Sequence, residues 1–293
     1  MLRTMNTLGL LLGLPWLILT HTLAPGAATT PTKTTAPPHY AWLTAAQVGG
    51  AQGLAARFAP PVGATREAAA AGSFAWWLRY LPLQPPGAAV HLHNGKLKNL
   101  QTVHAAVVRI DVGPRDLQQC ADAVIRLRAE YLFSQDPNKV HFHLTSGHDI
   151  WFSDWYGGRG FRARGEVVEP VAKAVETPTH AVFRRYLDQI FTYAGTRSVE
   201  REMRPVAMAT LQPGDVFVQG GSPGHAVLVL DVSANPRTGR KYFLLAQSYM
   251  PAQEIHVLRN LQNPKLSPWY ELNDKVTLET PEWDFSPSQL RRF

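Results

Sequence analysis

The last third of the chain contains three strand-like runs joined by connections that are too short for a helix. The runs are VFVQ (216–219), HAVLVLDV (225–232) and KYFLLAQS (241–248). GGSPG joins the first two and SANPRTGR joins the next two, and both segments are rich in turn-forming residues. A parallel pair would need a crossover of roughly a dozen residues or more. We therefore expect an antiparallel meander, with the apolar middle run as a central strand buried on both faces.

Helical patterns precede this meander. An amphipathic helix is indicated by apolar residues at helical spacing, namely Leu117, Cys120, Ala121, Val124, Leu127 and Tyr131. Thr179 is a candidate cap for a second helix that ends near Gly195, and Ser73 is one for a short helix that Pro82 stops. Helices ahead of a meander predict an α+β fold, with the helices packed on the meander or on a small open barrel.

The N-terminus has the features of an export signal. Arg3 precedes the apolar run LGLLLGLPWLILT, and the small residues of APGAA allow cleavage after Ala28. An uncleaved anchor remains an alternative to this signal peptide, residues 1–28. The Thr/Pro-rich residues 29–39 predict a disordered tether, and residues 40–293 contain no further linker or repeat, which indicates a single domain. We expect an exported protein, periplasmic or extracellular, without an integral membrane domain.

The charge of the chain narrows the class of partner. The net charge is +7 and the pI is about 9.6, yet no Lys/Arg run is longer than a dipeptide. This pattern argues against nucleic acid and fits a cell-envelope polymer or peptide, or simply a mildly basic surface. Nothing in the sequence indicates a cofactor, and we expect a monomer.

The chain has one cysteine, Cys120, so it can form no internal disulfide. A cysteine hydrolase needs a thiolate, a base, a group that orients the base, and donors for an oxyanion. The sequence offers Cys120 as nucleophile, His225 as base, Gln247 on the following strand as orienting group, Gln118 and Gln119 as oxyanion donors, and Gly224 as a residue that leaves room beside the base.

Cys120 also has a structural interpretation, because it lies on the apolar stripe of its helix and cysteine packs well as a small hydrophobe. Its place in the helix affects its chemistry. If Asp116 is the N-cap and Gln119 completes a capping box, Cys120 lies at the end of the first turn and still experiences the helix dipole. If Gly113 is the cap and Pro114 follows it, Cys120 falls in the second turn and the dipole contributes little.

The Cys120 helix is followed along the chain by PGDVFV, PGHAVLVLDV and LLAQS. This arrangement resembles that of the papain-like cell-wall hydrolases, in particular the NlpC-type peptidases and the CHAP amidases. This resemblance covers residues 213–250 and the Cys120 helix. It implies a papain-like α+β domain in which a cysteine near a helix start faces a histidine that opens a barrel strand. It also implies an amidase, peptidase or acyltransferase.

A second resemblance covers the whole chain. DLQQCADAVIRLRAEYL, GDVFVQGGSPGHAVLVLDV and LLAQSYMPAQEIHVL read like characteristic segments of a family of exported bacterial proteins known only as a domain of unknown function. That resemblance implies membership of the family and no established activity.

Two other groups of residues suggest competing functions. The WFSDWYGGRGF segment offers Trp151, Trp155, Tyr156 and Arg159 for stacking on a glycan or peptide and for pairing with a carboxylate. This favours a non-catalytic binding domain on the same scaffold.

The pairs His91/His93 and His141/His143, with His148 close by, raise the further alternative of a zinc hydrolase. A carboxylate at metal spacing is missing, so we assign no metal ligand. The first hypothesis remains a Cys-His amidase, peptidase or acyltransferase that acts on an amide of the cell envelope.

Overall fold

A computed structural model describes residues 38–49 and 52–293 of the chain. The predicted signal peptide, residues 1–28, and the predicted tether as far as residue 37 lie outside the described residues. The described residues belong to one unit that spans Ala36–Phe293. No helix in this described part combines the length and the apolar character that a membrane crossing requires.

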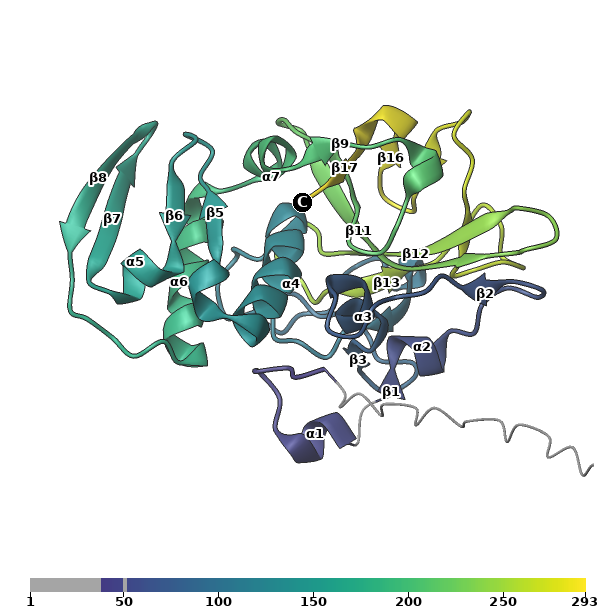
Figure 1. The fold of residues 1–293 in the computed structure, drawn as a ribbon, viewed down its shortest axis with the longest axis horizontal. Coiled ribbons are helices and arrows are strands. Elements are labelled where there is room, and N and C mark those ends of the chain that lie inside the picture. The colour runs from purple at the N-terminus through teal and green to yellow at the C-terminus, as the bar shows by residue number, and fades with distance from the viewer. Residues whose placement is uncertain (1–37, 50–51) are drawn as a thin grey trace, which may run out of the picture. The chain divides into compact units, whose positions relative to one another are not determined.

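An antiparallel sheet forms the centre of this unit (Figure 1). Its strands follow the order β4 (His104–Val107), β13 (His256–Leu258), β12 (Lys241–Gln247), β11 (His225–Ala234), β10 (Val216–Gln219), β17 (Leu290–Arg292) and β9 (Arg204–Pro205). In addition, β2 (Thr65–Arg66) pairs with β11, and β14 (Tyr270–Glu271) pairs with β12. The meander expected over β10, β11 and β12 is confirmed, and the sheet does not close into a barrel within the described residues.

Strand β11 is buried on both faces, as its apolar sequence predicts. Ala226 and Leu228 contribute to the larger hydrophobic cluster, which includes residues of helix α4, whereas Val227 and Val229 contribute to a second cluster. Successive residues of a strand point to opposite faces. The first residue of β11, His225, therefore points to the same face as Val227, and Ala226 points toward the helical side.

Helices α3 and α4 pack against β11. The helices are α1 (Ala45–Gly49), α2 (Leu54–Arg57), α3 (Phe74–Arg79), α4 (Cys120–Gln135), α5 (Phe152–Tyr156), α6 (His180–Tyr193) and α7 (Thr196–Glu202). The predicted caps of two of them are confirmed: Ser73 Oγ accepts from Trp76 N at 3.2 Å, and Thr179 Oγ1 accepts from Val182 N at 3.3 Å. Mixed helices and antiparallel sheets give the α+β class that the sequence predicts.

Smaller elements complete the described residues. Two-stranded antiparallel sheets are formed by β1 (Gln52–Gly53) with β3 (Pro82–Leu83), β5 (His141–His143) with β6 (Asp149–Trp151), β7 (Arg159–Arg164) with β8 (Val167–Ala172), and β15 (Leu278–Glu279) with β16 (Asp284–Phe285). Short 3₁₀ turns occur at Gln101–Val103, Pro137–Lys139, Met208–Thr210 and Pro287–Gln289. The turn between β15 and β16 reaches the site described below.

Candidate functional site

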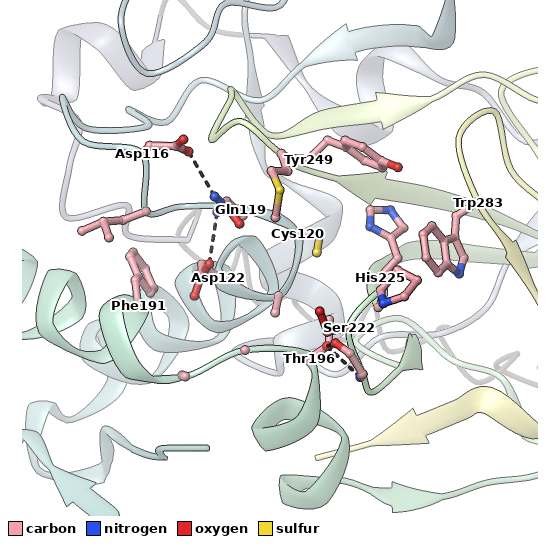
Figure 2. A pocket seen from close by; sticks show the side chains of 18 of the residues that line it. Asp116, Gln119, Cys120, Asp122, Phe191, Thr196, Ser222, His225, Tyr249 and Trp283 are labelled. Carbon is pink, nitrogen blue, oxygen red and sulfur yellow. Dashed lines mark hydrogen bonds between the residues drawn. The ribbon is translucent and has the colours of Figure 1, made fainter. Parts of the chain in front are cut away.

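A cavity of about 520 Å³ lies where the start of α4 meets the start of β11. Cys120 and His225 both line it, together with the GGSPG segment, the junction of α6 and α7, Tyr249, Met250 and Trp283. Figure 2 shows the Cys120 and His225 side chains among those that surround this space. Two residues that are 105 positions apart in the printed sequence therefore share one cavity.

The His225 imidazole is 2% exposed and its Nε2 lies 2.8 Å from Gln247 Oε1. The ring is enclosed by aromatic rings, with centroid separations of 4.9 Å to Tyr249, 5.4 Å to Trp283 and 6.0 Å to Phe285. An amide oxygen only accepts hydrogen bonds, so the Nε2 of His225 carries the hydrogen and Nδ1 is the proton acceptor of the neutral ring.

The orientation of the Gln247 amide is fixed by its other two contacts. Gln247 Nε2 donates to Glu282 Oε2 at 2.6 Å and lies 3.4 Å from His256 Nε2. His256 Nδ1 lies 2.9 Å from the carbonyl oxygen of Glu254, which assigns its hydrogen to Nδ1 and leaves Nε2 as an acceptor. The NH₂ end of Gln247 thus faces Glu282 and His256, and the amide oxygen faces the imidazole of His225.

Cys120 is half-buried and occupies the first position of α4. Both N-cap placements considered for this helix are wrong, because Gln119 is the N-cap and its backbone N–H donates to Asp122 Oδ2 at 3.1 Å. Asp116 serves elsewhere, since its Oδ1 accepts from Ala252 N at 2.7 Å and from Gln119 Nε2 at 3.1 Å. Cys120 therefore lies where the helix dipole is strongest and where backbone N–H groups lack partners inside the helix.

Burial and the nearby Asp122 carboxyl raise the pKa of the Cys120 thiol to about 11, although the backbone N–H groups of Ala121, Ala226 and Cys120 act in the opposite direction. Burial lowers the pKa of His225 to about 4, against the opposing effect of the Gln247 hydrogen bond. At neutral pH the thiol of Cys120 and the imidazole of His225 are accordingly both uncharged.

Asp122 is a buried carboxyl in the wall of the same cavity, with 5% exposure. Its Oδ1 is buried and has no hydrogen-bond partner among the described residues, whereas Oδ2 accepts from Gln119 N. Burial raises its pKa well above the ordinary value for an aspartate.

Gly224 allows the close approach of two segments at the cavity wall. A Cβ at this position would lie 2.6 Å from Thr196 Oγ1 and 2.7 Å from the carbonyl oxygen of Gln219, which are distances that carbon atoms do not tolerate. Thr196, the first residue of α7, also donates to Gly221 O and accepts from Gly221 N, each at 3.2 Å. Helix α7 therefore occupies part of the space expected beside His225, and the rest of that space belongs to the cavity.

The two glutamines before Cys120 have different surroundings. Gln118 is 1% exposed, and its Oε1 accepts from the buried Arg126 at 2.8 Å, so its side chain faces the interior. Its carbonyl oxygen accepts from Ser248 Oγ at 2.9 Å, which ties the start of α4 to the end of β12. Gln119 lines the cavity, and Asp116 takes one of its two amide hydrogens.

The aromatic segment predicted for substrate binding does not line the Cys120 cavity. Trp151 is 38% exposed and stacks on His141 at 4.0 Å, whereas Trp155 is buried and donates to Gln189 Oε1 at 2.6 Å. Tyr156 donates to Asn138 Oδ1 at 2.6 Å, and Arg159 pairs with Asp154. These residues belong to β6, α5 and β7.

Three of the four histidines in the two predicted pairs bind individual carboxylates, whereas both ring nitrogens of His93 are buried and have no hydrogen-bond partner among the described residues. His141 pairs with Asp149 at 2.8 Å and His143 pairs with Glu202 at 3.2 Å. His91 pairs with Glu254 at 3.1 Å. In residues 38–49 and 52–293, no group of three or more His, Cys, Asp or Glu residues could hold a metal ion.

The profile of a family described as "Domain of unknown function (4846)" matches residues 54–292. The chain belongs to this family. This confirms the whole-chain resemblance to a domain of unknown function. The chain has no match among curated proteins and none among solved structures.

Several residues of the site carry no signal in the sequence. Glu282 and Trp283 lie in a short turn, Lys98 lies in an irregular segment, and His256 reads as an ordinary strand residue. Their roles depend on contacts over long sequence separations, as with Glu282, which lies 35 residues from Gln247. Asp122 could have been recognised as a helix N3 carboxylate, had the helix start been placed at Cys120.

Proposed function

We propose that this chain is an exported cysteine hydrolase or acyltransferase that acts on an amide of the cell envelope. Cys120 is the nucleophile, His225 is the general base and acid, and Gln247 orients His225. The observation that supports this proposal best is the fixed amide of Gln247. It holds the hydrogen of His225 on Nε2 at 2.8 Å and leaves Nδ1 as the proton acceptor in the cavity that Cys120 lines.

The reaction begins with a neutral thiol and a neutral imidazole. His225 Nδ1 takes the proton of the Cys120 thiol while the sulfur forms a bond to the carbonyl carbon of the substrate. The negative charge that develops on the carbonyl oxygen meets the backbone N–H of Cys120 at the start of α4 and the free amide hydrogen of Gln119. The C–N bond then breaks, and the amine leaves with the proton that His225 returns.

In the second half of the reaction, the acyl group is transferred from Cys120 to an acceptor. Water, or an amine or hydroxyl acceptor, gives a proton to His225 Nδ1 and attacks the thioester carbon. The carbon–sulfur bond breaks and the sulfur regains its proton from His225. A water acceptor makes the chain a hydrolase, and an organic acceptor makes it an acyltransferase. The papain-like resemblance of residues 213–250 agrees with this assignment of roles.

The proposal is tested with p-nitrophenyl acetate, a small acyl donor that needs no specific binding site. We expect a burst of p-nitrophenolate equal to the amount of protein, and an acetyl group on Cys120 by peptide mass spectrometry. Cys120→Ala should lose the burst, and His225→Gln should slow it by on the order of a hundredfold or more. Circular dichroism should show both variants folded.

Absence of the burst in the native protein would overturn the proposal if Cys120 is acetylated only after denaturation. The thiol would then be a packing residue, and the cavity would be a binding pocket of the alternative, non-catalytic function.

A further inference from the structure

Behind Gln247 lies an ion pair that contributes no atom to the cavity lining. Lys98 Nζ and Glu282 Oε1 are 2.6 Å apart, and their side chains are 7% and 13% exposed. The Lys98 ammonium also lies 5.3 Å from the centre of the Tyr249 ring, which borders His225. An ion pair that is almost completely shielded from solvent is therefore separated from the proposed general base only by the side chain of Gln247.

Glu282 is held in place by its own turn as well as by Lys98. The turn between β15 and β16 is closed by Thr280, whose backbone N–H donates to Trp283 O at 3.0 Å and whose Oγ1 accepts from Trp283 N at 3.2 Å. Trp283 lies against the His225 ring at 5.4 Å. One turn thus supplies both a wall for the imidazole and the carboxylate that binds Gln247.

The carboxylate of Glu282 determines which end of the Gln247 amide faces it. An ionised Glu282 has no hydrogen to donate, so only the Nε2 end of Gln247 can face it at 2.6 Å. Turning the amide over would bring its oxygen against Glu282 Oε2 and against the acceptor nitrogen of His256. The contact to His256, at 3.4 Å, is longer than an ordinary hydrogen bond, whereas the contact to Glu282 is short and charge-assisted.

We propose that Glu282, paired with Lys98, is a positioning residue that sets the tautomer of His225 through Gln247. With the pair in place, Gln247 presents its oxygen and His225 keeps its hydrogen on Nε2. Without the pair, the amide can turn, its NH₂ group faces His225 Nε2, and the hydrogen moves to Nδ1. That tautomer cannot take a proton from Cys120. The effect on catalysis rests on the proposed function, whereas the effect on the tautomer does not.

The test compares His225 tautomers by long-range ¹H–¹⁵N NMR of protein labelled at histidine, with the His225 signals assigned by their loss in His225→Gln. The double variant Lys98→Met with Glu282→Leu removes the pair without leaving a buried charge, so it should stay folded. We expect the Nε2–H form in the native protein and a mixture of tautomers, or the Nδ1–H form, in the double variant.

Two further variants make the comparison specific. Lys98→Arg keeps the positive charge and should keep the Nε2–H form. Arg292→Met breaks another partly buried pair, with Asp215 at 2.6 Å, and should lower stability without changing the tautomer. In p-nitrophenyl acetate kinetics, the double variant should lose at least about tenfold in kcat with KM unchanged, because the pair contacts no substrate and the unproductive tautomer cannot act as base.

The outcomes separate this inference from the proposed function. If the double variant is folded and His225 keeps the Nε2–H form, the inference is overturned, whatever the activity. If the tautomer changes while the native protein forms no acyl-enzyme, the positioning role stands and the proposed catalysis fails.

Discussion

At the scale of single residues, the protonation states of Cys120 and His225 decide which kind of thiol chemistry is open to the site. A preformed thiolate–imidazolium pair needs a thiol with a low pKa and a histidine with a high one. Here burial acts on both groups in the opposite sense, with a pKa of about 11 for Cys120 and about 4 for His225. In the proposed mechanism, the thiol proton is therefore transferred to His225 during the attack on a bound substrate.

The reactivity of Cys120 should reflect its uncharged thiol, whose pKa is about 11. We expect the rate of iodoacetamide labelling at Cys120 to be low at pH 7 and to rise about tenfold per pH unit toward pH 10, because the thiolate fraction grows by that factor below the pKa. Asp122→Asn removes the charge that opposes the thiolate and should speed labelling at pH 9. Mass spectrometry after timed quenching gives the rates, and Cys120→Ser is the control without a thiol.

A labelling rate that is already maximal at pH 7 would show a thiolate in the resting protein and contradict the neutral pair. An unchanged rate in Asp122→Asn would mean that Asp122 does not oppose thiolate formation.

The sequence allowed three of the central residues to be proposed because each follows a local rule. Cys120 is the sole thiol, His225 opens an apolar strand after a glycine, and Gln247 lies on the next strand of a meander. Glu282 and Lys98 follow no such rule. Their pairing spans 184 positions, and it depends on the path of an irregular segment that no periodicity specifies.

At the scale of elements, strand order was predictable and the start of one helix was not. Short turns leave only an antiparallel pairing for β10, β11 and β12, whereas several polar residues before α4 compete for the N-cap. Asp116 has the preferred chemistry for a cap, but its Oδ1 is bound by Ala252 N, a residue 136 positions away. A tertiary contact therefore moved the helix start to Cys120 and brought the thiol to the positive end of the dipole.

The turn before β11 should be sensitive to one added methyl group. Gly224→Ala places a Cβ against Thr196 Oγ1 and two backbone oxygens, so the GGSPG segment and His225 must shift. We expect a loss of about 1–3 kcal/mol in the free energy of unfolding, measured with urea. The acylation burst should fall as well. Gly195→Ala is the matched control, because a Cβ there has no atom within 4 Å.

Equal stability of Gly224→Ala and Gly195→Ala would contradict the close packing of α7 against this turn. A destabilised Gly224→Ala protein with a normal burst would show that His225 does not depend on the turn for its position.

At the scale of the whole described unit, the site forms where the helical layer meets the central sheet, and buried polar groups join the two. Arg126 of α4 is fully buried and pairs with Glu130 at 2.8 Å, and Glu130 lies 3.0 Å from His180 of α6. On the sheet side, His225 and His256 are buried without a carboxylate in contact with either ring nitrogen. Protonation of these two histidines therefore destabilises the folded state, and the free energy of unfolding depends on pH.

The two buried histidines of the sheet, His225 and His256, determine whether the free energy of unfolding rises or falls with pH. Burial lowers the pKa of His225 to about 4 and of His256 to about 3, against an ordinary value of 6.5. Below pH 6.5 the unfolded chain binds protons at these positions while the folded chain does not. The free energy of unfolding contributed by each histidine is therefore fully present above pH 6.5 and is lost as the pH falls toward the folded pKa.

We expect His225 to account for a loss of roughly 3 kcal/mol between pH 7 and pH 4, from its shift of about 2.5 pH units. Urea unfolding at pH 7, 5.5 and 4 measures the loss, and His225→Gln, which cannot bind a proton, isolates it from every other titrating group. The native protein should lose about that much more stability than the variant over this range. Parallel losses in the two proteins would mean that His225 takes up its proton in the folded state as readily as in the unfolded chain, and the buried neutral base on which the proposed mechanism depends would be wrong.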